Sequence, residues 1–139
     1  MIIEESISIN ASPEAIFAIY KDVEGWSKWD PDTKEASLDG QFAIGTTGKL
    51  VPTKGRGVTM RVTELTPDRS FTVEACIPLF NMKFDHELAP DGMATRAIHR
   101  VTFSGPLTFL LGRIVGKQVR EGLPKTMLSL KSFAESSRP

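Results

Sequence analysis

The chain has 139 residues, of which 40 % are hydrophobic and 24 % charged, a composition typical of one soluble globular domain with a buried core. Its 17 lysines and arginines balance 17 aspartates and glutamates, and no basic run stands out, so the charge does not predict nucleic-acid binding. The single cysteine, Cys76, excludes an internal disulfide and a cysteine-based zinc site.

No segment predicts export or membrane insertion. The first residues have no basic start and no long apolar stretch, so we expect no signal peptide. A membrane span needs about 18 consecutive apolar residues. The longest apolar segment, residues 107–115, is shorter and contains Thr108 and Arg113. We therefore expect one cytoplasmic domain over residues 1–139, without a membrane span.

The first thirty residues predict a strand followed by two short helices. Apolar and polar residues roughly alternate over residues 3–9, as in a strand. Ser12-Pro13-Glu14 provides a hydroxyl for the N-cap, a proline for the first turn and an acid near the positive end of the helix dipole. Residues 16–20 carry one apolar stripe. A second short helix is expected over residues 23–29, because Pro31 disfavours helix in the residue before it.

Residues 34–104 predict a run of short strands. Turn-forming residues recur at Asp39-Gly40, residues 52–57, Pro67-Asp68 and Pro90-Asp91-Gly92, and the segments between them alternate in polarity.

The clearest hairpin surrounds Pro90-Asp91-Gly92. One face of its two strands is mostly apolar and carries both histidines of the chain. The residues on this face are Phe80, Met82, Phe84, His86, Leu88, Thr95, Ala97, His99, Val101 and Phe103. The opposite face places acidic side chains across from Arg96 and Arg100, which suits a solvated surface. The two histidines therefore belong to the inner face.

A helical stretch is expected from residue 107 to about residue 135. Gly112, Gly116, Leu123 and Met127 share one face at helical spacing. Gly122-Pro124 predicts a kink or a break between two helical segments. We expect the last residues, 136–139, to fray.

Three segments carry a resemblance to a known family. They are residues 7–17 (ISINASPEAIF), residues 22–31 (DVEGWSKWDP) and Gly105-Pro106-Leu107 at the start of the last helix. With the order of elements, they resemble the START-like (SRPBCC) superfamily, and within it the polyketide cyclase/dehydrase and lipid-transport branch. The resemblance implies an α+β helix-grip fold: a curved antiparallel sheet wrapped around a long C-terminal helix, with two short helices after the first strand. It also implies a cavity between the sheet and the last helix, but one fold hosts many activities.

The inner face of the hairpin suggests a binding site for an apolar molecule. The candidate ligand-binding residues are Trp26, Trp29, Met60, Met82, Phe84, His86, His99, Val101, Gly112, Arg113, Gly116, Leu123 and Met127. Gly112 and Gly116 either leave room for a ligand or let the helix pack closely on the sheet. Arg113 either anchors an anionic group at the pocket mouth or belongs to a solvated flank. The tryptophans and methionines either line the pocket or fill the core.

His86 and His99 are the candidate catalytic residues. An imidazole with a pKa near 6.5 can move a proton in a cyclisation or dehydration. The alternative, which we favour, is a pair of cavity-wall histidines satisfied by neighbouring groups. We expect no metal site, because strand parity turns Asp85 and Glu87 away from this face. No cofactor signature is present either.

These observations leave three hypotheses for function. The leading one is the binding or transport of a small hydrophobic ligand, lipid-like, polyketide-like or aromatic. The second is a cyclase/dehydrase-type enzyme that uses a cavity histidine as general acid or base. The third is an interaction module that docks through the apolar residues 107–115 onto a membrane surface or a second subunit, although burial of this segment is the default expectation. A monomer and a homodimer both fit the sequence.

Overall fold

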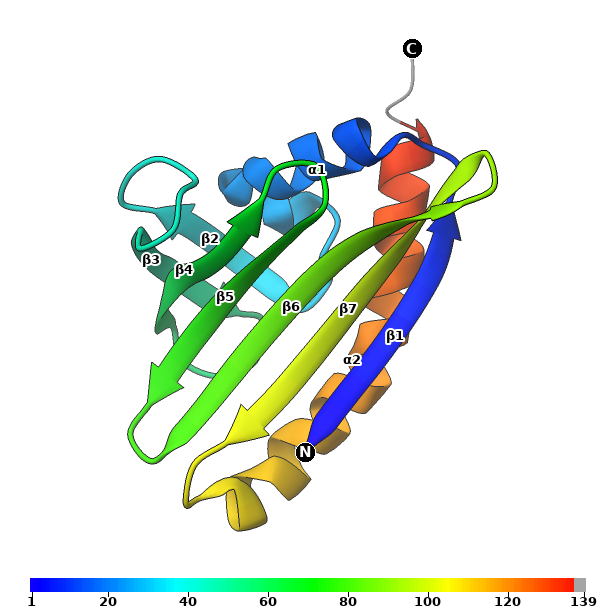
Figure 1. The fold of residues 1–139 in the computed structure, drawn as a ribbon. Coiled ribbons are helices and arrows are strands. Elements are labelled where there is room, and N and C mark those ends of the chain that lie inside the picture. Colours follow the sequence, from blue (N-terminus) through cyan, green and yellow to red (C-terminus); the bar gives the residue numbers. More distant parts are fainter. Residues whose placement is uncertain (137–139) are drawn as a thin grey trace.

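The computed structural model describes residues 1–136. Within them the chain adopts the helix-grip fold: a curved antiparallel sheet wraps around one long helix, and two short helices follow the first strand (Figure 1). The elements are β1 (Ile2–Ile9), α1 (Pro13–Lys21), the 3₁₀ helix η1 (Val23–Lys28), β2 (Thr33–Leu38), β3 (Thr47–Pro52), β4 (Val58–Thr66), β5 (Ser70–Ile77), β6 (Phe80–Asp91), β7 (Ala94–Ser104) and α2 (Thr108–Ser136). The expected fraying of residues 137–139 lies outside the described residues, and Ser136 still belongs to α2.

The strands of residues 1–136 form one seven-stranded sheet in the order β1-β7-β6-β5-β4-β3-β2. From β2 to β7 each strand pairs with the next one along the chain, and β1 joins the far edge beside β7. The pairing is irregular between Thr33 and Glu35 and between Val62 and Glu64. Such bulges bend a strand and increase its twist, and so help to curve the sheet around α2.

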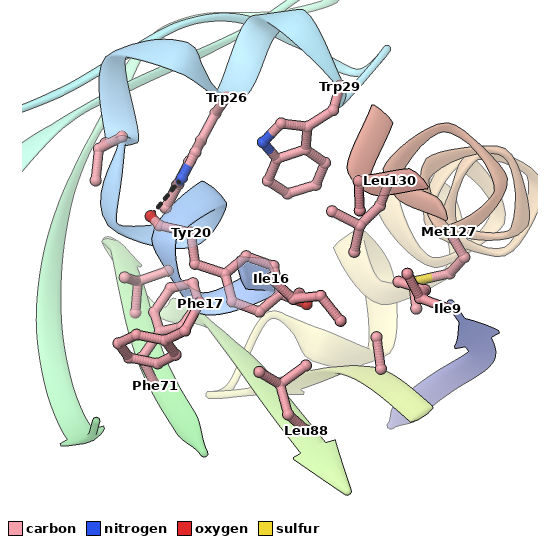
Figure 2. Packing of buried hydrophobic residues seen from close by; sticks show 14 of the residues in the cluster. Ile9, Ile16, Phe17, Tyr20, Trp26, Trp29, Phe71, Leu88, Met127 and Leu130 are labelled. Carbon is pink, nitrogen blue, oxygen red and sulfur yellow. Dashed lines mark hydrogen bonds between the residues drawn. The ribbon is translucent and has the colours of Figure 1, made fainter. Parts of the chain in front are cut away.

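The first short helix begins where its capping residue predicts, and the second covers Val23–Lys28 of the expected residues 23–29. The Ser12 hydroxyl accepts a hydrogen bond from the Ala15 amide at 3.1 Å, which confirms the N-cap of α1. Ile16, Phe17 and Tyr20 form the buried face of this helix. Figure 2 shows Tyr20 and Phe17 packed beside Phe71 of the sheet. Through these contacts α1 closes one end of the space between sheet and α2.

The β6–β7 hairpin has the predicted turn and the predicted faces. Phe84 lies opposite Val101, and His86 lies opposite His99. On the outer face Arg100 forms ion pairs with Glu4 of β1 at 2.8 Å and with Glu87 of β6 at 3.3 Å. The hairpin thus presents a mostly apolar surface with two imidazoles toward α2.

Of the kink or break predicted in the last helix, the break is wrong. α2 runs without interruption through Gly122 and Pro124. A proline inside a helix costs about 3 kcal/mol, because one hydrogen bond is lost and the ring crowds the preceding turn. Leu123 and Met127 lie on either side of Pro124, and both are buried in the core of the molecule. Their burial offsets this local penalty, so the helix continues.

The expected burial of residues 107–115 is also wrong for part of the segment. Leu107, Leu111 and Val115 pack against a core cluster built on β1, β6 and β7. Phe109 and Leu110, by contrast, are exposed. The sheet covers only one side of α2, and the first turns of the helix lie at the end of the sheet (Figure 1). Side chains on the other side of these turns are therefore largely exposed.

Candidate functional site

A cavity of about 720 Å³ lies between the inner face of the sheet and α2. Its walls come from η1, from β2 to β5, from the β6–β7 hairpin and from α2. Apart from Asp32, the exposed wall residues belong to two segments, residues 53–56 and residues 114–125. The mouth of the cavity therefore lies between the β3–β4 connection and the middle of α2.

Most of the candidate ligand-binding residues surround this cavity. Those in its wall are Trp26, Trp29, Met82, Phe84, His86, His99, Val101 and Leu123. They come from the sheet, from the corner after α1 and from α2. Strand parity predicts the inward position of the strand residues, and helical spacing predicts that of Leu123.

Five candidates lie outside the cavity wall. Met60 and Met127 are fully buried in the main core cluster, where they fill space between apolar neighbours. Gly112 and Gly116 are buried beside Met1 and the start of β1: a Cβ added to Gly116 would lie 2.9 Å from Met1 Sδ and 3.8 Å from Ile3 Cδ1. This position favours close packing of the helix as the reason for the glycines. The Arg113 side chain is exposed on the helix surface.

Two imidazoles of the cavity wall, His86 and His99, belong to a small polar cluster with Tyr20. His86 and His99 face each other across β6 and β7, with ring centroids 4.6 Å apart. A hydrogen bond of 2.8 Å joins Tyr20 Oη to His99 Nε2. The His86 ring stacks on Phe71 at 4.0 Å, and its Nδ1 lies 3.3 Å from the Phe71 carbonyl oxygen.

The hydrogen-bond partners assign the protons of these rings. A carbonyl oxygen can only accept, so His86 carries its proton on Nδ1 and leaves Nε2 as an acceptor. The hydroxyl of the fully buried Tyr20 has one hydrogen-bond partner among the described residues, His99 Nε2. We assign the hydroxyl as the donor, which places the His99 proton on Nδ1.

Burial keeps all three side chains neutral at pH 7. It lowers the pKa of His86 to about 4, and it lowers the pKa of His99 well below its ordinary value, with a further decrease from the neighbouring His86. Burial likewise raises the pKa of Tyr20 above its ordinary value. The cluster therefore offers neutral hydrogen-bonding groups in an apolar wall.

Asp30 belongs to the cavity wall but not to the sequence-based candidates. Its carboxylate accepts hydrogen bonds from Thr33 Oγ1 at 2.9 Å and from Thr126 Oγ1 at 3.2 Å. Burial raises the pKa of this carboxyl above its ordinary value. The bonds tie the corner before β2 to α2, and no local pattern signals a contact between residues 96 positions apart. The Asp30-Pro31 pair indicates only the end of a helix.

The tryptophans combine core and wall roles. The indole of Trp26 donates to the Tyr20 carbonyl at 2.9 Å (Figure 2). Trp29 Nε1 is buried without a hydrogen-bond partner among residues 1–136. Both side chains are buried in the main core cluster and also contribute to the cavity wall. The tryptophans therefore both fill the core and line the cavity.

The described residues contain no cluster of three His, Cys, Asp or Glu side chains arranged to hold a metal ion. None of the helices in residues 1–136 is long and apolar enough to cross a membrane.

The curved sheet, the long helix that it wraps and the cavity between them define a protein of the helix-grip class. Residues 1–135 match the family described as polyketide cyclase / dehydrase and lipid transport, and the chain belongs to this family. The search of curated protein sequences gives no match.

Solved structures share this fold at low sequence identity. The crystal structure of TTHA0849 from Thermus thermophilus is 17 % identical with a TM-score of 0.80, and the alignment covers 100 % of both chains. A START superfamily protein from Mycobacterium smegmatis is also 17 % identical, with a TM-score of 0.80 over 99 % of both chains. The di-domain ARO/CYC StfQ from the steffimycin biosynthetic pathway is 10 % identical, with a TM-score of 0.78 over 97 % of this chain and 50 % of StfQ.

Proposed function

We propose that this protein, as one domain of residues 1–139, binds or carries a small, largely apolar molecule in the cavity between sheet and α2. The observation that carries the proposal is the cavity itself: about 720 Å³ of space whose wall combines a large apolar surface with two imidazoles, and with charged residues such as Lys54 and Glu121 at its mouth. Ligand pockets of about 300–1,000 Å³ with few polar groups are typical of sites for small organic molecules. The family's description includes lipid transport, which supports a lipid-like, polyketide-like or aromatic ligand.

The polar cluster is expected to orient the ligand. With the protons assigned above, His99 Nδ1–H is a donor and His86 Nε2 is an acceptor, and both residues belong to the cavity wall. A ligand hydroxyl could use both, and a carbonyl could use the donor alone. Apolar burial would provide the affinity, and hydrogen bonds to the two imidazoles would set the orientation of the ligand.

An enzymatic function of the cyclase/dehydrase kind is the second candidate. Its support is the shared fold with StfQ and the placement of two imidazoles in the cavity wall. General acid or base catalysis is most efficient when the pKa of the catalytic group lies near the operating pH, but burial lowers the pKa of both histidines below 6.5. The lowered pKa values therefore favour the binding function over the enzymatic one.

We also propose that the protein is cytoplasmic, as the sequence predicts.

The first test fills the cavity. Val115 belongs to its wall and is half-buried on α2, so Val115→Trp should occupy ligand space. Because Val115 also packs against the cluster on β1, β6 and β7, circular dichroism checks that the variant folds. Native mass spectrometry against fatty acids, isoprenoids and polycyclic aromatic compounds should detect a bound compound in the parent protein. We expect Val115→Trp to weaken this binding at least about tenfold, equivalent to about 1.4 kcal/mol.

Leu128→Trp is the matched control, because Leu128 is exposed on the same helix and outside the cavity wall. It should bind like the parent protein. If no compound of these classes binds, or if both variants bind equally well, the cavity is not the binding site. His86→Ala and His99→Ala then separate the two functions: an enzyme loses turnover while binding is nearly intact, and a carrier has no turnover to lose.

A further inference from the structure

The first half of α2 leaves large apolar side chains in solvent. Phe109, Leu110 and Ile114 are 75 %, 54 % and 58 % exposed. Leu79, in the turn between β5 and β6, is 61 % exposed, and its carbonyl accepts a hydrogen bond from the Leu107 amide at 3.0 Å. The turn and the start of the helix are therefore neighbours. We call Leu79, Phe109, Leu110 and Ile114 the apolar patch.

The patch lies at one end of the molecule, where the β5–β6 turn and the start of α2 come together (Figure 1). Leu79 adopts a φ of +66°, in the left-handed region that asparagine or glycine occupies at lower cost. A leucine held there places an apolar side chain in solvent where turn chemistry would favour a small or polar one. Large apolar side chains that gather in solvent at one end of a molecule indicate a binding face.

Positive charges predominate beside the patch. Arg113, Lys117 and Arg120 are exposed on the same half of α2, and Glu121 is the one acidic residue among residues 107–122. A helix that combines exposed large apolar residues with a basic flank is typical of segments that lie on anionic membranes. Each lysine or arginine near an anionic bilayer is attracted to its negative surface potential.

We propose that the apolar patch docks on an anionic lipid bilayer, with Arg113, Lys117 and Arg120 contacting the headgroups. A second copy of the chain fits the patch less well. A twofold symmetric pair presents the same surface on both chains, so it would bring the three cations of each helix toward those of the other. Like charges at close range repel, whereas an anionic bilayer complements them.

The patch is continuous with the mouth of the cavity. Ile114 belongs to both, and its helix neighbours Leu111 and Val115 belong to the cavity wall. A docked molecule would hold the mouth against the bilayer, so an apolar ligand could enter without crossing water. The docking surface itself does not depend on whether the cavity binds a ligand.

Vesicle flotation tests the proposal. The protein should float with phosphatidylcholine vesicles that contain about 30 % phosphatidylglycerol, float poorly with phosphatidylcholine alone, and be released by salt of about 0.5 M, which screens the attraction. Phe109→Ser/Leu110→Ser and Lys117→Glu/Arg120→Glu should each lower the bound fraction about tenfold. These four side chains are exposed, so the variants should fold, which circular dichroism checks.

The matched controls are Leu128→Ser, an exposed leucine elsewhere on α2, and Lys28→Glu/Lys34→Glu, the same charge change on η1 and β2. Both should bind vesicles like the parent protein. Parent protein that does not float, or patch variants that bind as strongly as the controls, would overturn the docking proposal. So would light scattering that shows a dimer dissociated by Phe109→Ser/Leu110→Ser, because a second copy would then cover the patch.

Native mass spectrometry without vesicles separates this proposal from the proposed function. Phe109, Leu110, Lys117 and Arg120 lie outside the cavity wall, so their variants should keep any ligand that the parent protein binds. Vesicle binding without a ligand would overturn only the proposed function, and a ligand without vesicle binding would overturn only the docking.

Discussion

His86 and His99 lie side by side in an apolar wall, and this placement ties the stability of the fold to pH. Burial lowers the pKa of His86 to about 4 and that of His99 well below 6.5. An unfolded histidine titrates near pH 6.5, so between these values the unfolded state binds more protons than the folded state. The free energy of unfolding should therefore fall as the pH falls from 7 toward 4, by at most about 1.4 kcal/mol per pH unit for each histidine.

Urea denaturation at pH 7 and pH 5 measures this loss. His86→Gln and His99→Gln remove one titrating ring each, so each variant should lose less stability between the two pH values than the parent protein. Asp30 acts in the opposite direction, since its raised pKa favours the folded state as the pH falls, but it is present in all three proteins. If the parent protein and both variants lose the same stability between pH 7 and pH 5, burial does not lower the pKa of either histidine.

The cavity wall was predictable where one element determines a side chain's direction. The turn at Pro90-Asp91-Gly92 and strict alternation place His86 and His99 on the inner face, and the structure confirms that face. Tyr20, the partner of His99, comes from a helix 79 positions away along the chain, and its spacing indicates only a core residue. Contacts between distant elements carry no local signal.

At the scale of elements, the β7–α2 connection depends on one glycine. Gly105 has a φ of +104°, and a Cβ added there would lie 2.7 Å from the Leu79 carbonyl oxygen. Gly105→Ala should therefore lower the free energy of unfolding by about 2 kcal/mol or more, because strain and a backbone clash add together.

Gly92→Ala is the matched comparison for this substitution. Gly92 also has a positive φ, +63°, but a Cβ there would meet no atom within 4 Å. Only conformational strain remains, so we expect a loss of about 1 kcal/mol. Urea denaturation of both variants checks the difference; equal losses would mean that the Leu79 carbonyl moves aside and the clash costs nothing.

The two helical predictions that are wrong have the same origin. The penalty at Pro124 is local, and it predicts a break, but Leu123 and Met127 gain burial from strands that the local pattern does not include. The apolar run over residues 107–115 predicts burial, yet the sheet covers one side of the helix and leaves Phe109 in solvent. Tertiary packing decides both cases.

At the scale of the whole molecule, the three sides of α2 have three different surroundings. Gly112 and Gly116 bring one side of the helix close to β1, and residues 111 and 115 turn another side toward the cavity. Leu110 and Lys117 remain in solvent. The close contact with β1 fixes the helix at the edge of the sheet, so the space for a ligand remains on the side that faces β6 and β7.

A ligand in that space should stabilise the folded chain, because the unfolded chain has no cavity. At a free ligand concentration about 100 times Kd, the free energy of unfolding rises by about 2.7 kcal/mol. The unfolding entropy is about 2.1 cal/mol/K per residue, so for 139 residues this gain raises Tm by about 9 °C. Differential scanning calorimetry at increasing ligand concentration measures the rise. Val115→Trp should show almost none at the same concentrations, and an equal rise in that variant would place the ligand outside the cavity.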